Sequence, residues 1–270
     1  MNIHNGSVGE LLRDWRQRRR LSQLAFACDA EISARHLSFI ETGRSNPSRQ
    51  MLLHLAELLD VPFRERNRLL LAAGYAPVYS ETELESPDAE GARRAVDFIL
   101  KAHEPFPALA FDRQWNLVAA NAVVPLFFIG VAEHLLTPPI NVLRLSLHPE
   151  GLASRIENLN EWRTHVFSRL KQQIETTGDE KLAALMTELE NYPATAKPTA
   201  SHHNEYGGLI VPLRLKSEAG TLSFYTTTTV FGTAMDITFS ELVIESFIPG
   251  DTETTRIIRN MAEAMKDNQK

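Results

Sequence analysis

The chain has 270 residues, 43% of them hydrophobic, which is enough for a sizeable core and for two domains. It holds no run of about 18 apolar residues, so we expect no transmembrane helix. An N-terminus without basic and apolar regions predicts a cytoplasmic protein without a secretory signal. The net charge of −6 hides an uneven distribution, because residues 1–75 contain 11 arginines, no lysine and 8 acidic residues, a balance of +3. Positive charge made of arginine is therefore concentrated near the N-terminus, as on a surface that faces DNA.

Residues 7–75 are predicted to form five short helices with short connections. Apolar residues recur at helical spacing in "SVGELLRDWRQRRR" and in the segments that follow it. Ser22, Ser33 and Ser48 each stand just before a helical segment and are candidate N-caps. The single cysteine, Cys28, lies among alanines and is predicted to be a small filler of the helical core. We expect a compact α domain.

The segment 33–42 has polar and aromatic side chains where a helix should face water. At about 100° per residue, Leu37 and Ile40 define the buried face. An arginine can bond a guanine edge through two donors, and phenylalanine or alanine can contact a thymine methyl group. Two short helices joined by "DAEI" match a helix-turn-helix, whose second helix enters the major groove. The outward face of this second helix is predicted to present Ala34, Arg35, Ser38, Phe39 and Thr42.

The stretch "LRDWRQRRRLSQLAFACDAEISARHLSFIETGRSNPS" resembles the Cro/C1-type (XRE) helix-turn-helix family over most of its length. The resemblance implies that Gln23 contacts a phosphate or a base, that Ala34, Arg35 and Ser38 read bases, and that the loop after the helix contacts the DNA backbone. The candidate DNA-binding residues are Gln23, Ser33, Ala34, Arg35, Ser38, Phe39, Arg44 and Asn46.

The same resemblance implies a structural ion pair between Arg16 and Glu41, which removes both residues from the candidate DNA contacts. The arginines at 18–20 remain open, either as phosphate contacts or as a solvated helix end. His36 lies on the shoulder of the buried face, which favours packing over base reading.

The acidic, proline-containing stretch "APVYSETELESPDAEGA" is predicted to be a linker, residues 76–91. After it we expect a helix, a hairpin of 108–112 and 116–120, and a helix over "AVVPLFFIG" that Asn121 caps. Two long helices, strands in "GLIVPLRL", "TLSFYTTTTVF" and "ELVIESFIP", and a last helix follow. The predicted fold is multidomain, α followed by α/β. It consists of a five-helix helix-turn-helix domain and a PAS-like α+β domain with a small antiparallel sheet and a cavity beside it.

The order of "RNRLLLAAGYAP", "ALAFDRQWNLVAAN", "NVLRLSLHPEGL", "IVPLRL" and "FGTAMDITFSELVIESFIP" resembles the MmyB-like regulators over nearly the full chain. The resemblance implies a transcription regulator with a helix-turn-helix domain at 7–75 and a PAS-like domain at 92–270 that holds an apolar, fatty-acid-like ligand. We also expect the second domain to dimerise. The segment 175–206 departs from the pattern of these regulators and leaves the identity of the ligand open.

The candidate ligand contacts are of two kinds. Apolar side chains would form the wall, although core packing is the default role of each. A carboxylate head would need an arginine or a histidine, which a face of the helix "EWRTHVFSRL" offers, unless those two side chains lie on the rim and face water. The candidate residues are Trp115, Phe127, Phe128, Arg144, Trp162, His165, Val166, Arg169, Phe224 and Phe231.

No Walker loop, GxSxG, HExxH or GxGxxG motif is present, so we expect neither an enzyme nor a cofactor. Adjacent side chains diverge on a strand, so the pair His202 and His203 is not expected to bind a metal. We expect a homodimer on a roughly palindromic operator, whose ligand changes the placement of two helix-turn-helix units about 34 Å apart. The alternatives are a C-terminal domain that only dimerises or binds a protein, and one that is an enzyme acting on an acyl ligand.

Overall fold

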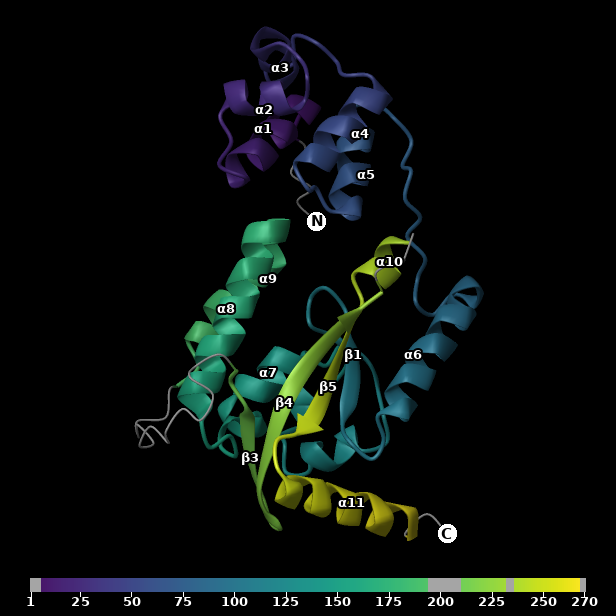
Figure 1. Cartoon of the computed structure of the whole chain (residues 1–270), viewed down its shortest axis with the longest axis vertical. Helices are drawn as coiled ribbons and strands as arrows, with labels where there is room; N and C mark the ends of the chain where they lie inside the picture. Colours follow the sequence, from purple (N-terminus) through teal and green to yellow (C-terminus); the bar gives the residue numbers. More distant parts are fainter. Residues whose placement is uncertain (1–5, 194–209, 232–235, 268–270) are drawn as a thin grey trace. The chain divides into compact units, whose positions relative to one another are not determined.

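The computed structural model describes residues 6–193, 210–231 and 236–267 (Figure 1). It divides into two compact units, one comprising Met1–Glu81 with two short later segments and the other comprising the remaining residues. None of the described helices combines the length and the apolar character that a membrane span needs.

The first unit is a bundle of five short helices around one apolar core. Ser7, Ser22, Ser33 and Ser48 cap the first four of these helices, and each hydroxyl oxygen accepts a hydrogen bond from a backbone N–H three residues later. The caps predicted at Ser22, Ser33 and Ser48 are therefore confirmed. The helices are α1 (Val8–Arg18), α2 (Gln23–Asp29), α3 (Ala34–Glu41), α4 (Arg49–Leu58) and α5 (Phe63–Ala72).

Cys28 does not belong to this core, so its predicted role as a core filler is wrong. Its side chain is exposed, whereas Phe26 and Ala27 of the same helix are buried. Each helical residue turns the side chain by about 100°, and one step beyond Ala27 carries the thiol past the edge of the buried arc.

Beyond residue 81 the chain forms a five-stranded antiparallel sheet with helices on both faces. The elements before the long helices are η1 (Pro87–Ala89), α6 (Glu90–Ala102), β1 (Ala108–Phe111), β2 (Leu117–Ala120), η2 (Val124–Phe128), η3 (Glu133–Leu135), α7 (Val142–Leu147) and η4 (Pro149–Ala153). The remaining elements are α8 (Leu159–Thr177), α9 (Glu180–Glu190), β3 (Leu213–Ser217), β4 (Gly220–Val230), α10 (Ile237–Ser240), β5 (Val243–Pro249) and α11 (Thr252–Asp267).

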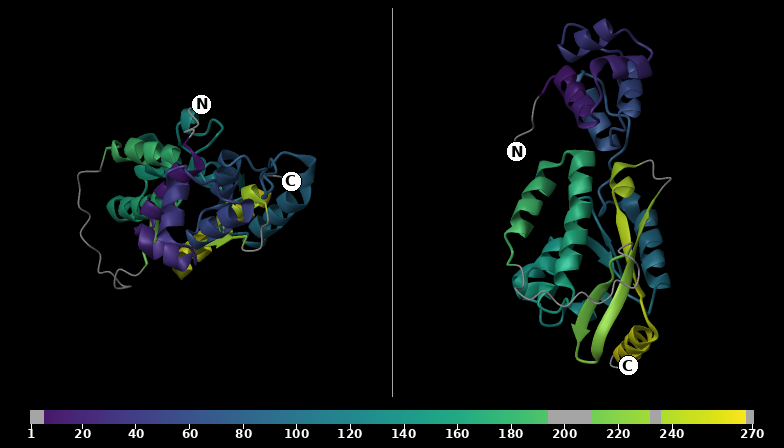
Figure 2. Two further views of the ribbon diagram at one scale, coloured as in Figure 1. Left: turned by 90° about the horizontal axis from the view of Figure 1, so that it is seen from above. Right: turned by 60° about the vertical axis from the view of Figure 1, so that its left-hand side comes forward.

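The strand order β2-β1-β5-β4-β3 gives the sheet two distinct faces. Because side chains alternate along a strand, Leu109 and Phe111 of β1 share the larger core with α7 and α8, while Ala108 and Ala110 pack in a smaller cluster with α6. Figure 2 shows the helix pair α8 and α9 on one side of the sheet and α6 on the other. The α+β architecture follows the prediction.

The helix predicted over 122–130 and capped by Asn121 is absent, and the short 3-10 helix η2 stands in its place. Asn121 is buried, and its Oδ1 accepts a hydrogen bond from the Ala108 N–H at 3.3 Å. Its Nδ2 donates to the carbonyl oxygens of Leu100 at 3.2 Å and Phe106 at 2.8 Å. The side chain therefore ties the end of α6 to the start of β1, so it is not available to cap a helix.

Candidate functional site

The buried and outward faces of α3 are formed by the residues that helical stepping predicts. Leu37 and Ile40 are fully buried, whereas Arg35 is exposed and Ser38 and Phe39 are half-buried. Ala34 is half-buried at the start of the helix, beside these three residues. The small alanine permits a close approach of the backbone to a groove, and the polar residues can contact base edges.

Phe39 lies between two arginines on this face. The Cζ atom of Arg35 is 5.3 Å from the Phe39 ring centroid, and the Cζ atom of Arg44 is 5.9 Å from it. Both distances fit a cation–π contact, which restricts where each guanidinium group can lie. Phe39 therefore positions one arginine suited to a base edge and one suited to a phosphate.

Arg16 and Glu41 form the buried ion pair that the family resemblance implies. Arg16 Nε and Nη2 donate to the two carboxylate oxygens of Glu41 at 2.6 and 2.9 Å, and Nη1 donates to the Leu21 carbonyl at 2.7 Å. Burial opposes ionisation of Glu41, but hydrogen bonds from Arg16 and Gln23 outweigh it and lower the pKa of the carboxyl group. This pair links α1 to α3 and fixes the orientation of the candidate recognition helix.

The remaining candidate DNA contacts differ in whether their polar atoms are already hydrogen-bonded within the protein. Gln23 Nε2 donates to Glu41 Oε2 at 2.7 Å, which leaves its carbonyl oxygen for any contact with DNA. The Ser33 hydroxyl oxygen is used by the cap to the His36 N–H, at 3.1 Å. Arg44 and Asn46 are exposed in the loop after α3.

Of the arginines at 18–20, Arg19 has a structural role. Its Nε donates to the Leu59 carbonyl at 2.7 Å and its Nη2 donates to the Asp60 carbonyl at 2.8 Å, so it binds the carboxyl end of α4. Arg18 and Arg20 are exposed. The two alternatives, a phosphate contact and a solvated helix end, therefore stay open for Arg18 and Arg20 alone.

A cavity of about 100 Å³ lies in the second unit, between the larger-core face of the sheet and the helices α7 and α8. With the adjoining open space counted, the hollow measures about 800 Å³. The lining residues are Pro107, Leu109, Trp115, Val124, Phe127, Phe128, Val142, Leu143, Leu145, Ser146, Leu152, Trp162, Val166, Arg169, Leu213, Leu215, Phe224, Glu245 and Phe247.

The indole N–H groups of the two tryptophans that line the cavity are both hydrogen-bonded to polar side chains. Trp115 Nε1 donates to Gln173 Oε1 at 2.8 Å, and Trp162 Nε1 donates to Ser146 Oγ at 2.9 Å. Since their polar atoms are satisfied, the rings offer apolar surface to the cavity. The candidates that line the cavity are Trp115, Phe127, Phe128, Trp162, Val166, Arg169 and Phe224.

Three candidates, Phe231, Arg144 and His165, lie outside this lining. Phe231 packs against the smaller cluster on the opposite face of the sheet. An odd separation from Phe224 along a strand reverses the direction of the side chain, which explains the misplacement.

Arg144 is directed to α9 instead of the cavity, since its Nε and Nη2 donate to both carboxylate oxygens of Glu188 at 2.8 and 2.7 Å. The bond to Arg144 lowers the pKa of Glu188, while burial and the bond to Glu188 raise the pKa of Tyr192 to about 12. His165 is half-buried on α8, and its ring centroid is 5.6 Å from that of Trp162. It precedes Val166 by one residue, and about 100° of rotation takes it off the lining face.

Arg169 and Glu245 form the charged end of the cavity. Arg169 Nη1 lies 3.1 Å from Glu245 Oε1, and the Arg169 Cζ lies 4.9 Å from the Trp115 ring centroid. The Glu245 side chain is 8% exposed and the Arg169 side chain 26% exposed. Arg169 therefore lies at the cavity lining and is paired with Glu245, while about a quarter of its side chain remains accessible to water.

The candidates predicted from the sequence do not include Glu245 or any of the six leucines of the wall. Glu245 is the only charged residue inside the apolar stretch "LVIESFIP", and alternation places it on one face with Val243 and Phe247. That signal was sufficient to mark it as a buried charge in need of a partner.

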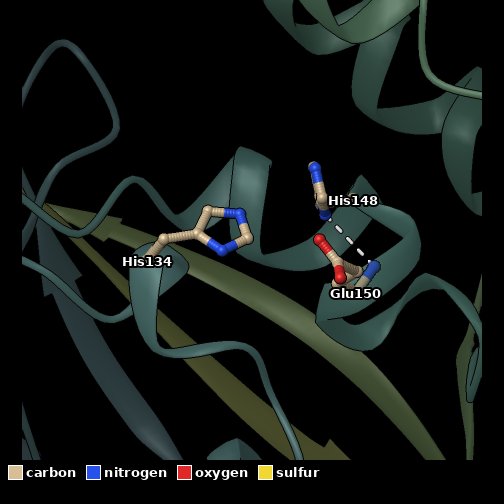
Figure 3. A group of neighbouring side chains, drawn as sticks. All are labelled: His134, His148 and Glu150. Atoms are coloured by element: carbon tan, nitrogen blue, oxygen red, sulfur yellow. Dashed lines mark hydrogen bonds between the residues drawn. The ribbon is translucent and has the colours of Figure 1, made fainter.

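A separate cluster outside the cavity contains His134, His148 and Glu150, whose ligand-type atoms lie within 4.8 Å of one another (Figure 3). The His148 Nδ1 accepts the Glu150 backbone N–H at 3.1 Å, so its neutral ring carries the proton on Nε2. Neither nitrogen of His148 then offers a free lone pair, and we assign no metal to this cluster. The pair His202 and His203 lies outside the described residues.

Comparison with known protein families gives two matches. Residues 7–69 match a helix-turn-helix domain. Residues 92–261 match the MmyB-like transcription regulator ligand binding domain and include every residue that lines the cavity. A search of curated proteins finds no match to the chain.

Proposed function

The chain belongs to the family of MmyB-like transcription regulators, and we propose that the small molecule bound by its C-terminal domain is apolar and fatty-acid-like. The observation that carries this proposal is the lining of the cavity. Among its nineteen residues, only Ser146, Arg169 and Glu245 are polar or charged outside the two indole rings. A pocket with an apolar wall and a few polar groups at one place suits a chain with a single polar head.

The size of the cavity constrains how such a molecule binds. A volume of about 100 Å³ is below the range of about 300–1,000 Å³ that is common for ligand pockets. A long chain must therefore displace wall side chains or extend into the adjoining open space. A ligand that changes the packing of its domain has different affinities for two conformations, which is the requirement for a switch.

We propose that the regulator acts as a homodimer on a roughly palindromic operator, with one α3 in each half-site. Two recognition helices must be about 34 Å apart to read successive turns of the same DNA face. A ligand that changes the relative placement of the two copies of α3 then changes the affinity for the operator.

We propose no catalytic activity for the cavity. Of the part of the chain that the structure describes, Ser146 is the one hydroxyl side chain that lines it. Its Oγ accepts the Trp162 indole N–H at 2.9 Å, and among the described residues it has no hydrogen bond to a carboxylate or a histidine that could act as a base.

The substitution Arg35→Ala tests the proposed base-reading face. We expect the binding free energy of the preferred base at one operator position to fall by about 1–3 kcal/mol, because the bidentate contact to that base edge is removed. The base preference at that position should therefore relax. The measurement is a titration of duplexes that carry each of the four bases at every position of an operator selected from random sequence.

Two variants serve as controls for Arg35. Arg35→Lys keeps the charge but loses the planar pair of donors, so it should retain overall affinity better than base preference. Arg256→Ala, an exposed arginine of α11, should bind the operator like the wild type. If Arg35→Ala also behaves like the wild type at every position, α3 does not read bases through this residue.

The ligand proposal is tested by native mass spectrometry and thermal denaturation of the full chain with fatty acids of 8–18 carbons. We expect one bound fatty acid per chain and a higher unfolding temperature. Val166→Trp is the matched control, because a bulkier side chain on the wall should fill the cavity and abolish binding at a cost of about 1–3 kcal/mol in stability. Absence of bound fatty acid and of any stabilisation in the wild type rejects the proposal.

A further inference from the structure

The charged end of the cavity is already electrically paired. Arg169 Nη1 lies 3.1 Å from Glu245 Oε1, and Arg169 Nη2 donates to Thr228 Oγ1 at 3.3 Å. The strand register sets Glu245 of β5 opposite Leu109 of β1 and Thr228 of β4, in the middle of the sheet. A ligand head that reaches this end meets a neutral pair, not a free cation.

An anionic head would be unfavourable here. It would place two negative charges beside one guanidinium group in an apolar enclosure, and a buried charge without a partner is costly. An uncharged head that both accepts and donates hydrogen bonds can instead accept from Arg169 and donate to Glu245, and it leaves the ion pair intact.

We propose that Glu245 makes the cavity selective for long-chain molecules with an uncharged, hydrogen-bonding head, such as a protonated carboxylic acid, a primary amide or an alcohol, and excludes permanently anionic amphiphiles. This inference rests on the proposed function, in which the cavity holds an apolar chain. Glu245 then determines specificity, and Arg169 alone is not the anchor of a carboxylate.

A carboxylic acid consequently binds together with a proton. Burial raises the pKa of Glu245 while Arg169 and Thr226 oppose the shift, so the carboxyl group is itself a suitable proton acceptor. His165, also on α8, has its pKa lowered by burial and by Arg169, which disfavours a second positive charge beside the pair. The facing side chains of β1 and β4, Leu109 and Thr228, do not titrate.

The test compares three ligands of ten carbon atoms each, namely decanamide, decanoic acid and decane-1-sulfonate, by calorimetric titration of the full chain at pH 6 and pH 8. For the wild type, we expect the dissociation constant of decanamide to be equal at both pH values within about twofold. That of decanoic acid should rise by up to about tenfold per pH unit, because one proton is taken up with the ligand. The sulfonate should bind at least about tenfold more weakly than the amide.

Glu245→Gln should reverse this order, because Arg169 is then an unpaired cation. We expect the sulfonate to bind at least about tenfold more tightly than it does to the wild type, and decanoic acid to lose its pH dependence. The double substitution Arg169→Gln with Glu245→Gln removes both charges and should bind the amide without the gain for the sulfonate.

Two results separate failure of this inference from failure of the proposed function. If the wild type binds all three ten-carbon ligands equally well at both pH values, the selectivity is wrong and the apolar-ligand function stands. If none of these ligands binds any of the proteins, the proposed function fails and the inference fails with it. The wild-type series decides the matter even if a variant does not fold.

Discussion

Replacing Arg16 with alanine is expected to lower the free energy of unfolding of the helix-turn-helix unit by about 3–5 kcal/mol. The reason is the carboxylate left behind, because the Glu41 side chain is only 1% exposed and would lose both hydrogen bonds from Arg16. Urea denaturation of the full chain, followed by amide hydrogen exchange in α1 to α5, measures the change. After correction for the unfolded fraction, Arg16→Ala should prefer the same operator bases as the wild type. Arg16 lies in the bundle and not on the outward face of α3.

The pH dependence of this loss has a definite sign. Glu41 has a lowered pKa in the folded chain, so its contribution is fully present above the unfolded pKa of about 4.3 and is lost as the pH falls. The wild type and Arg16→Ala should therefore differ most near pH 7 and converge in acid. Arg49→Ala, at an exposed position of α4, is the control and should change stability by less than about 0.5 kcal/mol. Equal stability of Arg16→Ala and the wild type at pH 7 would contradict the structural role of the pair.

Replacing Phe224 with alanine should destabilise the ligand-binding unit by about 3–5 kcal/mol in the absence of ligand. Phe224 is 1% exposed and makes edge contacts with Phe127 at 5.9 Å and Phe247 at 6.1 Å between ring centroids. The space it vacates joins the existing cavity and cannot close by itself. An apolar ligand should fill that space, so thermal denaturation should show a larger rise in unfolding temperature with fatty acid than the wild type shows.

Leu222→Ala provides the matched control for this result. Leu222 is fully buried two residues earlier on β4 and belongs to the same core, but it does not line the cavity. Leu222→Ala should lower the free energy of unfolding by about 2–5 kcal/mol, and the fatty acid should stabilise this variant no more than it stabilises the wild type. Equal rescue of the two variants would show that the ligand binds somewhere other than this cavity.

Local rules predict the helix-turn-helix unit well because its determinants are close together in the chain. A serine before each of the first four helices supplies a cap, and the stepping of Leu37 and Ile40 fixes the outward face of α3 without knowledge of the tertiary structure. The ion pair of Arg16 and Glu41 joins residues 25 positions apart, and only the family resemblance made it predictable.

The ligand-binding unit is harder to predict from the sequence because its polar contacts join segments that are far apart in the chain. Arg169 and Glu245 are 76 residues apart, and Arg144 and Glu188 are 44 apart, so no local pattern shows which arginine faces the cavity. The position of Phe231, in contrast, follows from strand alternation alone, because an odd separation from Phe224 places the two rings on opposite faces.

The most direct test of the regulator is operator affinity with and without a bound ligand. The full chain is titrated with the selected duplex, alone and with the fatty acid that binds most tightly, in parallel with Val166→Trp. We predict that the ligand changes the dissociation constant of the wild type about 5- to 150-fold, the usual range of coupling between two sites, and leaves that of Val166→Trp unchanged. An operator affinity of the wild type that is the same with an empty and with an occupied cavity would contradict the account.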